Sequence, residues 1–160
     1  ADTSHVRAAA ERAGLAPPDV ISAPHHEMAG WLAAADLAVA LLQPWPSSLA
    51  TSPTKIGEGL ACGLPTVVRA HVGDGDLAAP GLFPVNPDDD VALPATAERL
   101  CRLLRDPAAA RQSARASAEA HFDLAKIGVA RYRAVYRALG VPFAVRPAPE
   151  AARLTPEAHA

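Results

Sequence analysis

The feature that most constrains the fold is one helix placed between two apolar runs. Residues 37–42 are continuously apolar, which is typical of a strand buried on both faces of a parallel sheet. A helix is expected to begin at the capping residue Ser52, with Pro53 in its first turn, and to end at Gly63. The β-branched run at residues 66–68 then predicts a second strand. This order predicts a parallel β-α-β unit.

The rest of the chain continues the alternation of strands and helices. Further strands are expected at residues 20–23 and 82–85, and further helices at residues 4–14, 27–35, 92–105, 107–120 and 123–139. Their spacing predicts that particular apolar side chains face the core: Met28, Trp31, Leu32 and Ala35; Leu100, Leu103 and Leu104; Ile127, Tyr132, Val135, Tyr136 and Leu139. The predicted fold class is therefore α/β, a Rossmann-like parallel sheet with helices on both faces. Residues 1–139 are expected to form this domain, followed by a Pro-rich, disordered tail at 140–160.

Composition limits the function classes that fit the chain. Half of its 160 residues are apolar and the net charge is −2, so no basic surface for nucleic acid is expected. No apolar run approaches the length of about 20 residues that spans a bilayer. Cys62 and Cys101 fall in predicted amphipathic helices and are interpreted as reduced core thiols. These features predict a soluble, cytoplasmic protein.

The helix beginning at Ser52 carries the candidate site. It follows a buried strand, so it should begin at the carboxyl edge of the sheet, where open α/β folds bind ligands. Its free N–H groups favour phosphate, and Thr54 and Lys55 add a hydroxyl and a cation. Glu58 lies one turn beyond Thr54, where its carboxylate could accept hydrogen bonds from a sugar diol. On physics alone, an ordinary helix cap with an exposed Lys55–Glu58 pair remains open as the alternative.

The stretch from Ser52 to Pro65, SPTKIGEGLACGLP, resembles the donor-site motif of the group-1 (family 4) retaining glycosyltransferases. The resemblance extends in order through residues 26–37, residues 103–107 and the closing segment from His121 to Leu139. It implies a GT-B fold, of which this chain would be the C-terminal donor-binding half. It also implies transfer of a hexose from a nucleoside diphosphate sugar, with retained anomeric configuration and without a metal or other cofactor.

The resemblance also implies residue roles. Glu58 would hold the ribose hydroxyls of a UDP- or GDP-linked sugar, with Ser52, Pro53, Thr54 and Lys55 near the diphosphate or the sugar. Leu60 would pack below the nucleotide. Backbone around Ala23, Pro24 and His25 would border the base. No catalytic residue can be assigned from the sequence.

Two departures from the family pattern stand out. Ala50 occupies the position where many members carry a first glutamate near the transferred sugar. The first two strands of the family's C-terminal half, and the N-terminal acceptor domain, are not matched by any segment. The chain is therefore expected to be a partial donor domain, inactive alone, with exposed sheet edges that favour pairing with the acceptor domain or a partner chain. The resemblance leaves room for a peripheral membrane association of the full enzyme.

Other polar clusters have weaker interpretations. The sequence His25-His26-Glu27 lacks a second group of ligands, so no metal site is expected. His71, Asp74 and Asp76 lie in the loop after the strand predicted at residues 66–68, where a donor-sugar contact and a solvated loop are both open. The acidic residues 88–90 favour a helix N-terminus. A loop rich in proline and serine is expected over residues 43–52, and Trp45, between two prolines in this loop, is expected to be exposed.

Two function hypotheses follow. The first is the donor half of a glycosyltransferase. The second, favoured by Ala50 and by the unmatched strands, is a non-catalytic nucleotide- or partner-binding module of the same fold.

Overall fold

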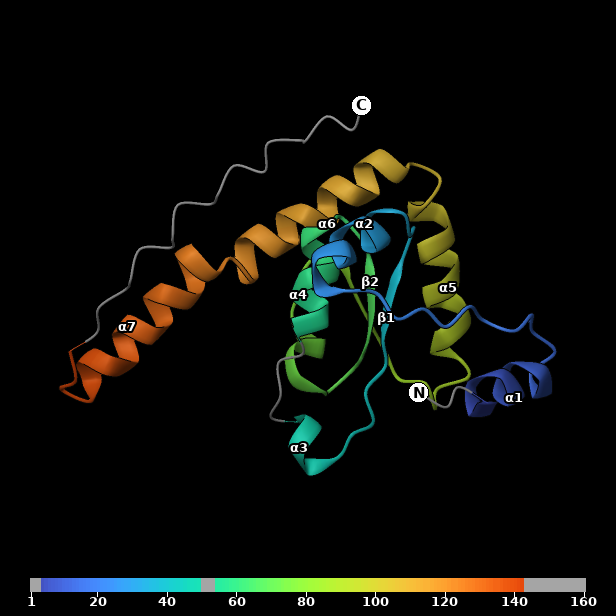
Figure 1. Cartoon of the computed structure of the whole chain (residues 1–160), viewed down its shortest axis with the longest axis horizontal. Helices are drawn as coiled ribbons and strands as arrows, with labels where there is room; N and C mark the ends of the chain where they lie inside the picture. Colours follow the sequence, from blue (N-terminus) through green and yellow to red (C-terminus); the bar gives the residue numbers. More distant parts are fainter. Residues whose placement is uncertain (1–3, 50–53, 143–160) are drawn as a thin grey trace.

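A computed structural model describes residues 4–49 and 54–142 of the chain. Its centre is a parallel sheet of three strands in the order β1 (Ala38–Ala40), β2 (Thr66–Arg69) and β3 (Leu82–Val85) (Figure 1). Ala38 lies opposite Thr66, which in turn lies opposite Leu82. The predicted parallel α/β arrangement is confirmed at this level.

Seven α-helices and three short turns are formed by the described residues. The helices are α1 (Ser4–Arg12), α2 (Met28–Ala33), α3 (Pro46–Leu49), α4 (Thr54–Ala61), α5 (Ala92–Leu103), α6 (Pro107–His121) and α7 (Val129–Ala138). The turns are the 3₁₀ segments η1 (His25–Glu27) and η2 (Gly73–Asp76) and the π-helical segment η3 (Leu124–Gly128). Helix α3 corrects the expectation of a loop without secondary structure over residues 43–52, and its first residue is proline, which suits the first turn of a helix.

Helices cover both faces of the sheet. On one face, α4 and α6 pack against β2 and β3 in a cluster of buried side chains: Ile56, Leu60, Val68, Ala79, Leu82, Ala114 and Ala118. On the other face, α5 packs through Leu100 against Val67, Phe83 and Val85. Neighbouring side chains of a strand point to opposite faces, so Val67 and Val68 serve different clusters. Among the three predicted inward leucines of α5, Leu100 is buried and Leu103 and Leu104 are half-buried.

The first part of the chain departs most from prediction. Residues 20–23 form no strand, and Val20 and Ile21 are exposed by 49% and 55%. The segment pairs with none of the described strands, so it has no ladder to fix its backbone. Strand β1 is an edge strand and spans three residues of the predicted six. The expectation of burial on both faces is wrong, because Val39 is exposed by 62% and nothing among the described residues covers it.

Several predicted core positions are also wrong. Met28 and Trp31 of α2 are exposed by 37% and 49%, and Cys101 lies on the solvent side of α5. Helix α7 buries no residue, although its apolar residues recur at helical spacing, and Figure 1 shows it extending away from the sheet. Its exposed apolar side chains are Tyr132, Val135, Tyr136 and Leu139. In α2 and α7 the spacing is amphipathic, but the described chain offers little surface to cover the apolar side.

Two further expectations are confirmed. Trp45 is exposed by 66%. In the acidic run, the Asp89 carboxylate accepts hydrogen bonds from the N–H groups of Val91 and Ala92 at the start of α5. No helix within residues 4–49 and 54–142 is long and apolar enough to cross a bilayer. The predicted tail lies, from residue 143 onward, outside the described residues.

Candidate functional site

Helix α4 presents two different faces. Ile56, Gly59 and Leu60 are buried against the sheet and α6, whereas Thr54, Lys55 and Glu58 are exposed. The helix follows β1 and leads into β2, which runs parallel to β1, so α4 begins at the carboxyl edge of the sheet. Thr54 and Lys55 therefore lie at that edge, and Glu58 lies one turn further along. Ser52 and Pro53, the two other predicted residues of this segment, lie outside the described residues.

The carboxylate of Glu58 opens onto a groove rather than pairing locally. Lys55 and Glu58 form no ion pair with each other, so the interpretation as a surface pair is not supported by a contact. The groove has a volume of about 880 Å³ and lies between α4, α6 and the segment that leads into α7. Its lining is mainly apolar, with charged groups at intervals: Thr54, Gly57, Glu58, Ala61, Arg115, Ala118, Glu119, Phe122, Asp123, Leu124, Ala125 and Tyr132.

The charged groups in the groove are partly neutralised by their neighbours. Arg115 lies 3.6 Å from Glu119, and Lys126 lies 3.5 Å from Asp123. The backbone N–H of Lys126 donates to Asp123 and holds the pKa of that carboxyl below its usual value. Glu58 makes no ion pair with any other described residue. It is therefore the acidic group of this groove that is most available to a ligand's hydroxyl or amino groups.

The two glycines of α4 have a packing role. A Cβ at Gly59 would lie 3.2 Å from Ala38 Cβ and 3.1 Å from Thr66 Oγ1, so the helix sits close on β1 and β2. A Cβ at Gly57 would meet the ring of Phe122 at 3.3 Å. At both positions another part of the chain therefore approaches the helix closely. Leu60 is fully buried, so it could act on a ligand only through the helix that it anchors.

The remaining predicted residues lie on another segment. Pro24 precedes η1, His25 begins it, and both are exposed. Neither lines the groove beside Glu58. The structure thus places Thr54 and Glu58 in the groove, with Lys55 on α4 beside them but outside the groove's lining. It does not bring Pro24 and His25 into this groove. Their role at the base stays a prediction.

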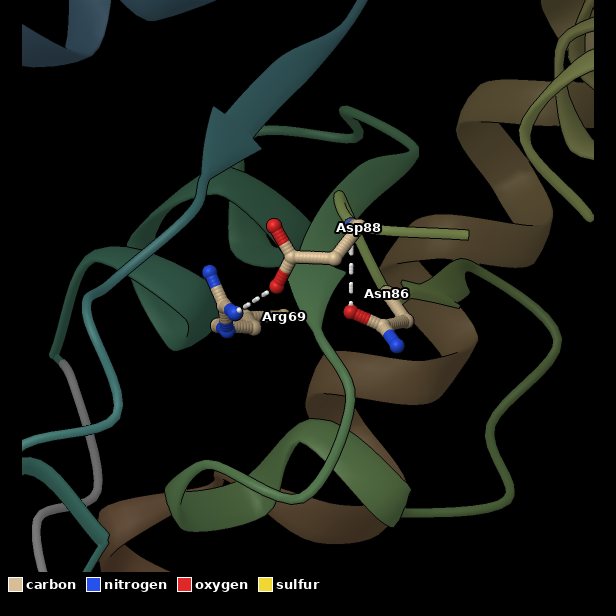
Figure 2. A network of polar contacts seen from close by, with 3 residues as sticks. All are labelled: Arg69, Asn86 and Asp88. Atoms are coloured by element: carbon tan, nitrogen blue, oxygen red, sulfur yellow. Dashed lines mark hydrogen bonds and ion pairs between the residues drawn. The ribbon is translucent and has the colours of Figure 1, made fainter. Parts of the chain in front are cut away.

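A largely buried cation at the carboxyl edge, Arg69, was missed by the sequence analysis. Arg69 ends β2, and its side chain is only 14% exposed. Its Nη2 donates to Asp88 Oδ2 at 2.8 Å, and the Asp88 N–H donates to Asn86 Oδ1 at 3.2 Å (Figure 2). This network ties the end of β2 to the turn after β3. The only signal in the sequence was an arginine at the end of a β-branched run, because the partner lies 19 residues away.

The loop after β2 also brings together two of the residues that the sequence singled out. His71 Nδ1 lies 2.9 Å from Asp76 Oδ2, and the His71 N–H donates to Asp76 Oδ1 at 2.9 Å. The bond from the His71 backbone N–H holds the pKa of the Asp76 carboxyl below its usual value, and the side-chain bond to His71 acts in the same direction.

No cluster of three metal-ligating side chains forms within the described part of the chain. His26 and Glu27 lie 3.8 Å apart on the surface, without a third ligand. Comparisons with family models, with curated proteins and with solved structures gave no match. The geometry of the site and the resemblance of its motif therefore carry the functional argument.

Proposed function

We propose that the chain binds a nucleoside diphosphate sugar at the start of α4 and serves as the donor half of a retaining glycosyltransferase. The observation that supports this most is the exposed face of α4. A hydroxyl at Thr54, a cation at Lys55 and an unpaired carboxylate at Glu58 follow one another at the carboxyl edge of a parallel sheet. Parallel α/β proteins commonly bind phosphorylated ligands at this edge.

Each group matches one part of such a ligand. The ammonium of Lys55 and the helix N-terminus suit the diphosphate, and they can offset the charge that the leaving phosphate develops. The carboxylate of Glu58 can accept two hydrogen bonds from the 2′- and 3′-hydroxyls of a ribose. UDP and GDP are the nucleotides expected from the motif's resemblance. An acceptor domain or partner chain would supply the second substrate, and with it a peripheral membrane contact of the whole enzyme.

A second candidate function is favoured by β1. Its outer edge is unpaired within the described chain, and Val39 exposes an apolar side chain there. Such an edge readily accepts another strand. Together with Ala50, this favours a non-catalytic module that binds a nucleotide or a partner chain with the same fold.

The test is titration calorimetry of the chain with UDP, GDP and ADP, repeated on Glu58→Ala. We expect one nucleotide to bind and the variant to lose about 10–100-fold in affinity, because hydrogen bonds to a charged group contribute about 1.5–3 kcal/mol. Unfolding free energy should change by less than about 0.5 kcal/mol, because Glu58 is exposed. Glu98→Ala, an exposed glutamate on α5 at the other face of the sheet, is the matched control. Equal affinity in Glu58→Ala and the wild type would reject the ribose assignment.

A further inference from the structure

The loop after β2 contains a residue held in a strained backbone conformation. His71 has a φ of 60°, and it is the one non-glycine residue with positive φ within residues 4–49 and 54–142. For a residue with a Cβ, this left-handed region is sterically unfavourable, because the Cβ crowds the following carbonyl oxygen. Such strain persists where the surroundings impose it, and it concentrates at functional sites.

The surroundings of His71 hold its backbone in this left-handed conformation. Asp76 binds the residue twice, once at the backbone N–H and once at the ring. A Cβ at Gly75 would overlap the carbonyl oxygen of Arg69, so the loop closes this tightly only with glycine at that position. The Ala70 N–H donates to Val85 O at 2.8 Å, and Leu77 packs against the cluster under α4. Both ends of the loop are thus fixed to the sheet.

This arrangement leaves one ring nitrogen of His71 available. With Asp76 accepting from Nδ1–H, the neutral imidazole carries its lone pair on Nε2. The side chain is 86% exposed, so Nε2 is open to a ligand from solution. A neutral imidazole nitrogen accepts a hydrogen bond from a hydroxyl, and hydroxyls are the groups by which sugars differ from one another.

The position of His71 links it to the proposed donor site. It follows β2 at the carboxyl edge, and Lys55 lies at the same edge, after the neighbouring strand β1. Leu77, next to Asp76, packs against the cluster that contains Ile56, the residue after Lys55. The resemblance of the motif implies that Ala50 stands where a carboxylate would otherwise reach the transferred sugar. A polar group from the neighbouring loop can fill that role.

We propose that His71, oriented by Asp76, accepts a hydrogen bond at Nε2 from a hydroxyl of the transferred sugar and so helps to select that sugar. The inference rests on the proposed function, because it assumes that a nucleoside diphosphate sugar lies across the start of α4. Asp76 is a positioning residue: it fixes the tautomer and the direction of the ring.

The test compares ligands with and without the sugar. Titration calorimetry is carried out with UDP and UDP-glucose, UDP-galactose and UDP-N-acetylglucosamine, and with GDP and GDP-mannose. We expect His71→Asn to lower the affinity for the preferred nucleotide sugar about tenfold and to leave the affinity for the parent nucleotide unchanged, as one lost hydrogen bond predicts. Asparagine is chosen because it tolerates positive φ. His71→Gly, which relaxes the backbone, should show the same loss, so a folding defect cannot produce it.

Two further variants separate positioning from structure. Asp76→Asn should lower the affinity for the same nucleotide sugar by a smaller factor, because Asn keeps an acceptor but loses the charge. His5→Ala, on the exposed face of α1, should change nothing.

The outcomes separate this inference from the proposed function. If the wild type binds no nucleotide, the proposed function and the role of His71 are both rejected. If nucleotide binding depends on Glu58 but His71→Asn leaves the nucleotide sugar's affinity unchanged, only the role of His71 is rejected. An equal loss of affinity for the nucleotide and for the nucleotide sugar would indicate that the imidazole contacts the diphosphate. That result would also reject the proposed contact of His71 with the sugar.

Discussion

Helices α4 and α7 have similar apolar spacing, but α4 packs into the core and α7 does not. Helix α4 buries Ile56, Gly59 and Leu60 between the sheet and α6, whereas α7, which is longer, buries none of its residues. The difference lies in what each helix meets. Helix α4 packs against both β1 and β2, but α7 leaves the domain after η3 and contacts mainly that segment. Amphipathic spacing therefore predicts a helix and its apolar side, but not a surface to cover it.

The largest predicted effect tests this comparison directly. Leu60→Ala should lower the free energy of unfolding by about 2–5 kcal/mol, because it removes a fully buried side chain and leaves a cavity. Leu139→Ala, at a side chain exposed by 69%, should change it by less than about 0.5 kcal/mol. Urea denaturation of both variants measures the contrast. A loss above about 1 kcal/mol for Leu139→Ala would show that α7 is covered in solution.

An intermediate effect is expected where α6 holds the sheet through a buried polar contact. The Ser117 hydroxyl accepts from the Gly81 N–H at 3.0 Å and donates to the Ser113 carbonyl at 3.0 Å. Ser117→Ala should destabilise the protein by about 1–3 kcal/mol, because it leaves a buried N–H without a partner. Urea denaturation checks this, with Ser113→Ala as the control, since that variant keeps the accepting carbonyl. Equal stability of the two variants would contradict the assignment.

The presence or absence of a packing partner also explains which parts of the structure could be predicted. Strands β2 and β3 and helices α5 and α6 follow from local patterns, because their partners lie in adjacent elements of the same sheet. The segment at residues 20–23 is as apolar as β3, yet it forms no strand, since strand formation needs a pairing edge as well as a suitable sequence. Helix α3 was missed because prolines and serines were interpreted as a loop, although a proline can begin a helix.

The candidate site likewise has features that the sequence could predict and features that it could not. The exposure of Thr54, Lys55 and Glu58 follows from their spacing along one helix, so the sequence could predict it. The pairing of Arg69 with Asp88 depends on the register of β2 and β3, which no local pattern contains. The bonds between His71 and Asp76 depend on how tightly the loop closes at Gly75. Sequence analysis could name these residues as neighbours in the chain, but it could not give their geometry.

The smallest predicted effect concerns Asp76 and the acid side of the stability profile. The His71 N–H holds the pKa of Asp76 below its ordinary value of 3.8, so the folded state binds a proton there less readily than the unfolded state. The resulting stabilisation is fully present above that ordinary value and is lost as the pH falls through the lower folded pKa. Asp76→Asn removes this contribution, so the unfolding free energy of the variant should fall less steeply on acidification below about pH 4.

The effect should stay within about 1 kcal/mol, because the Asp76 side chain is 56% exposed and solvent screens its interactions. Urea denaturation at a series of acidic pH values measures it, with Asp19→Asn in the exposed segment before α2 as the control. Identical slopes for Asp76→Asn and the wild type would mean that the loop does not hold the carboxylate in solution. The orientation of the His71 ring would then lack its support, because the same two hydrogen bonds fix both groups.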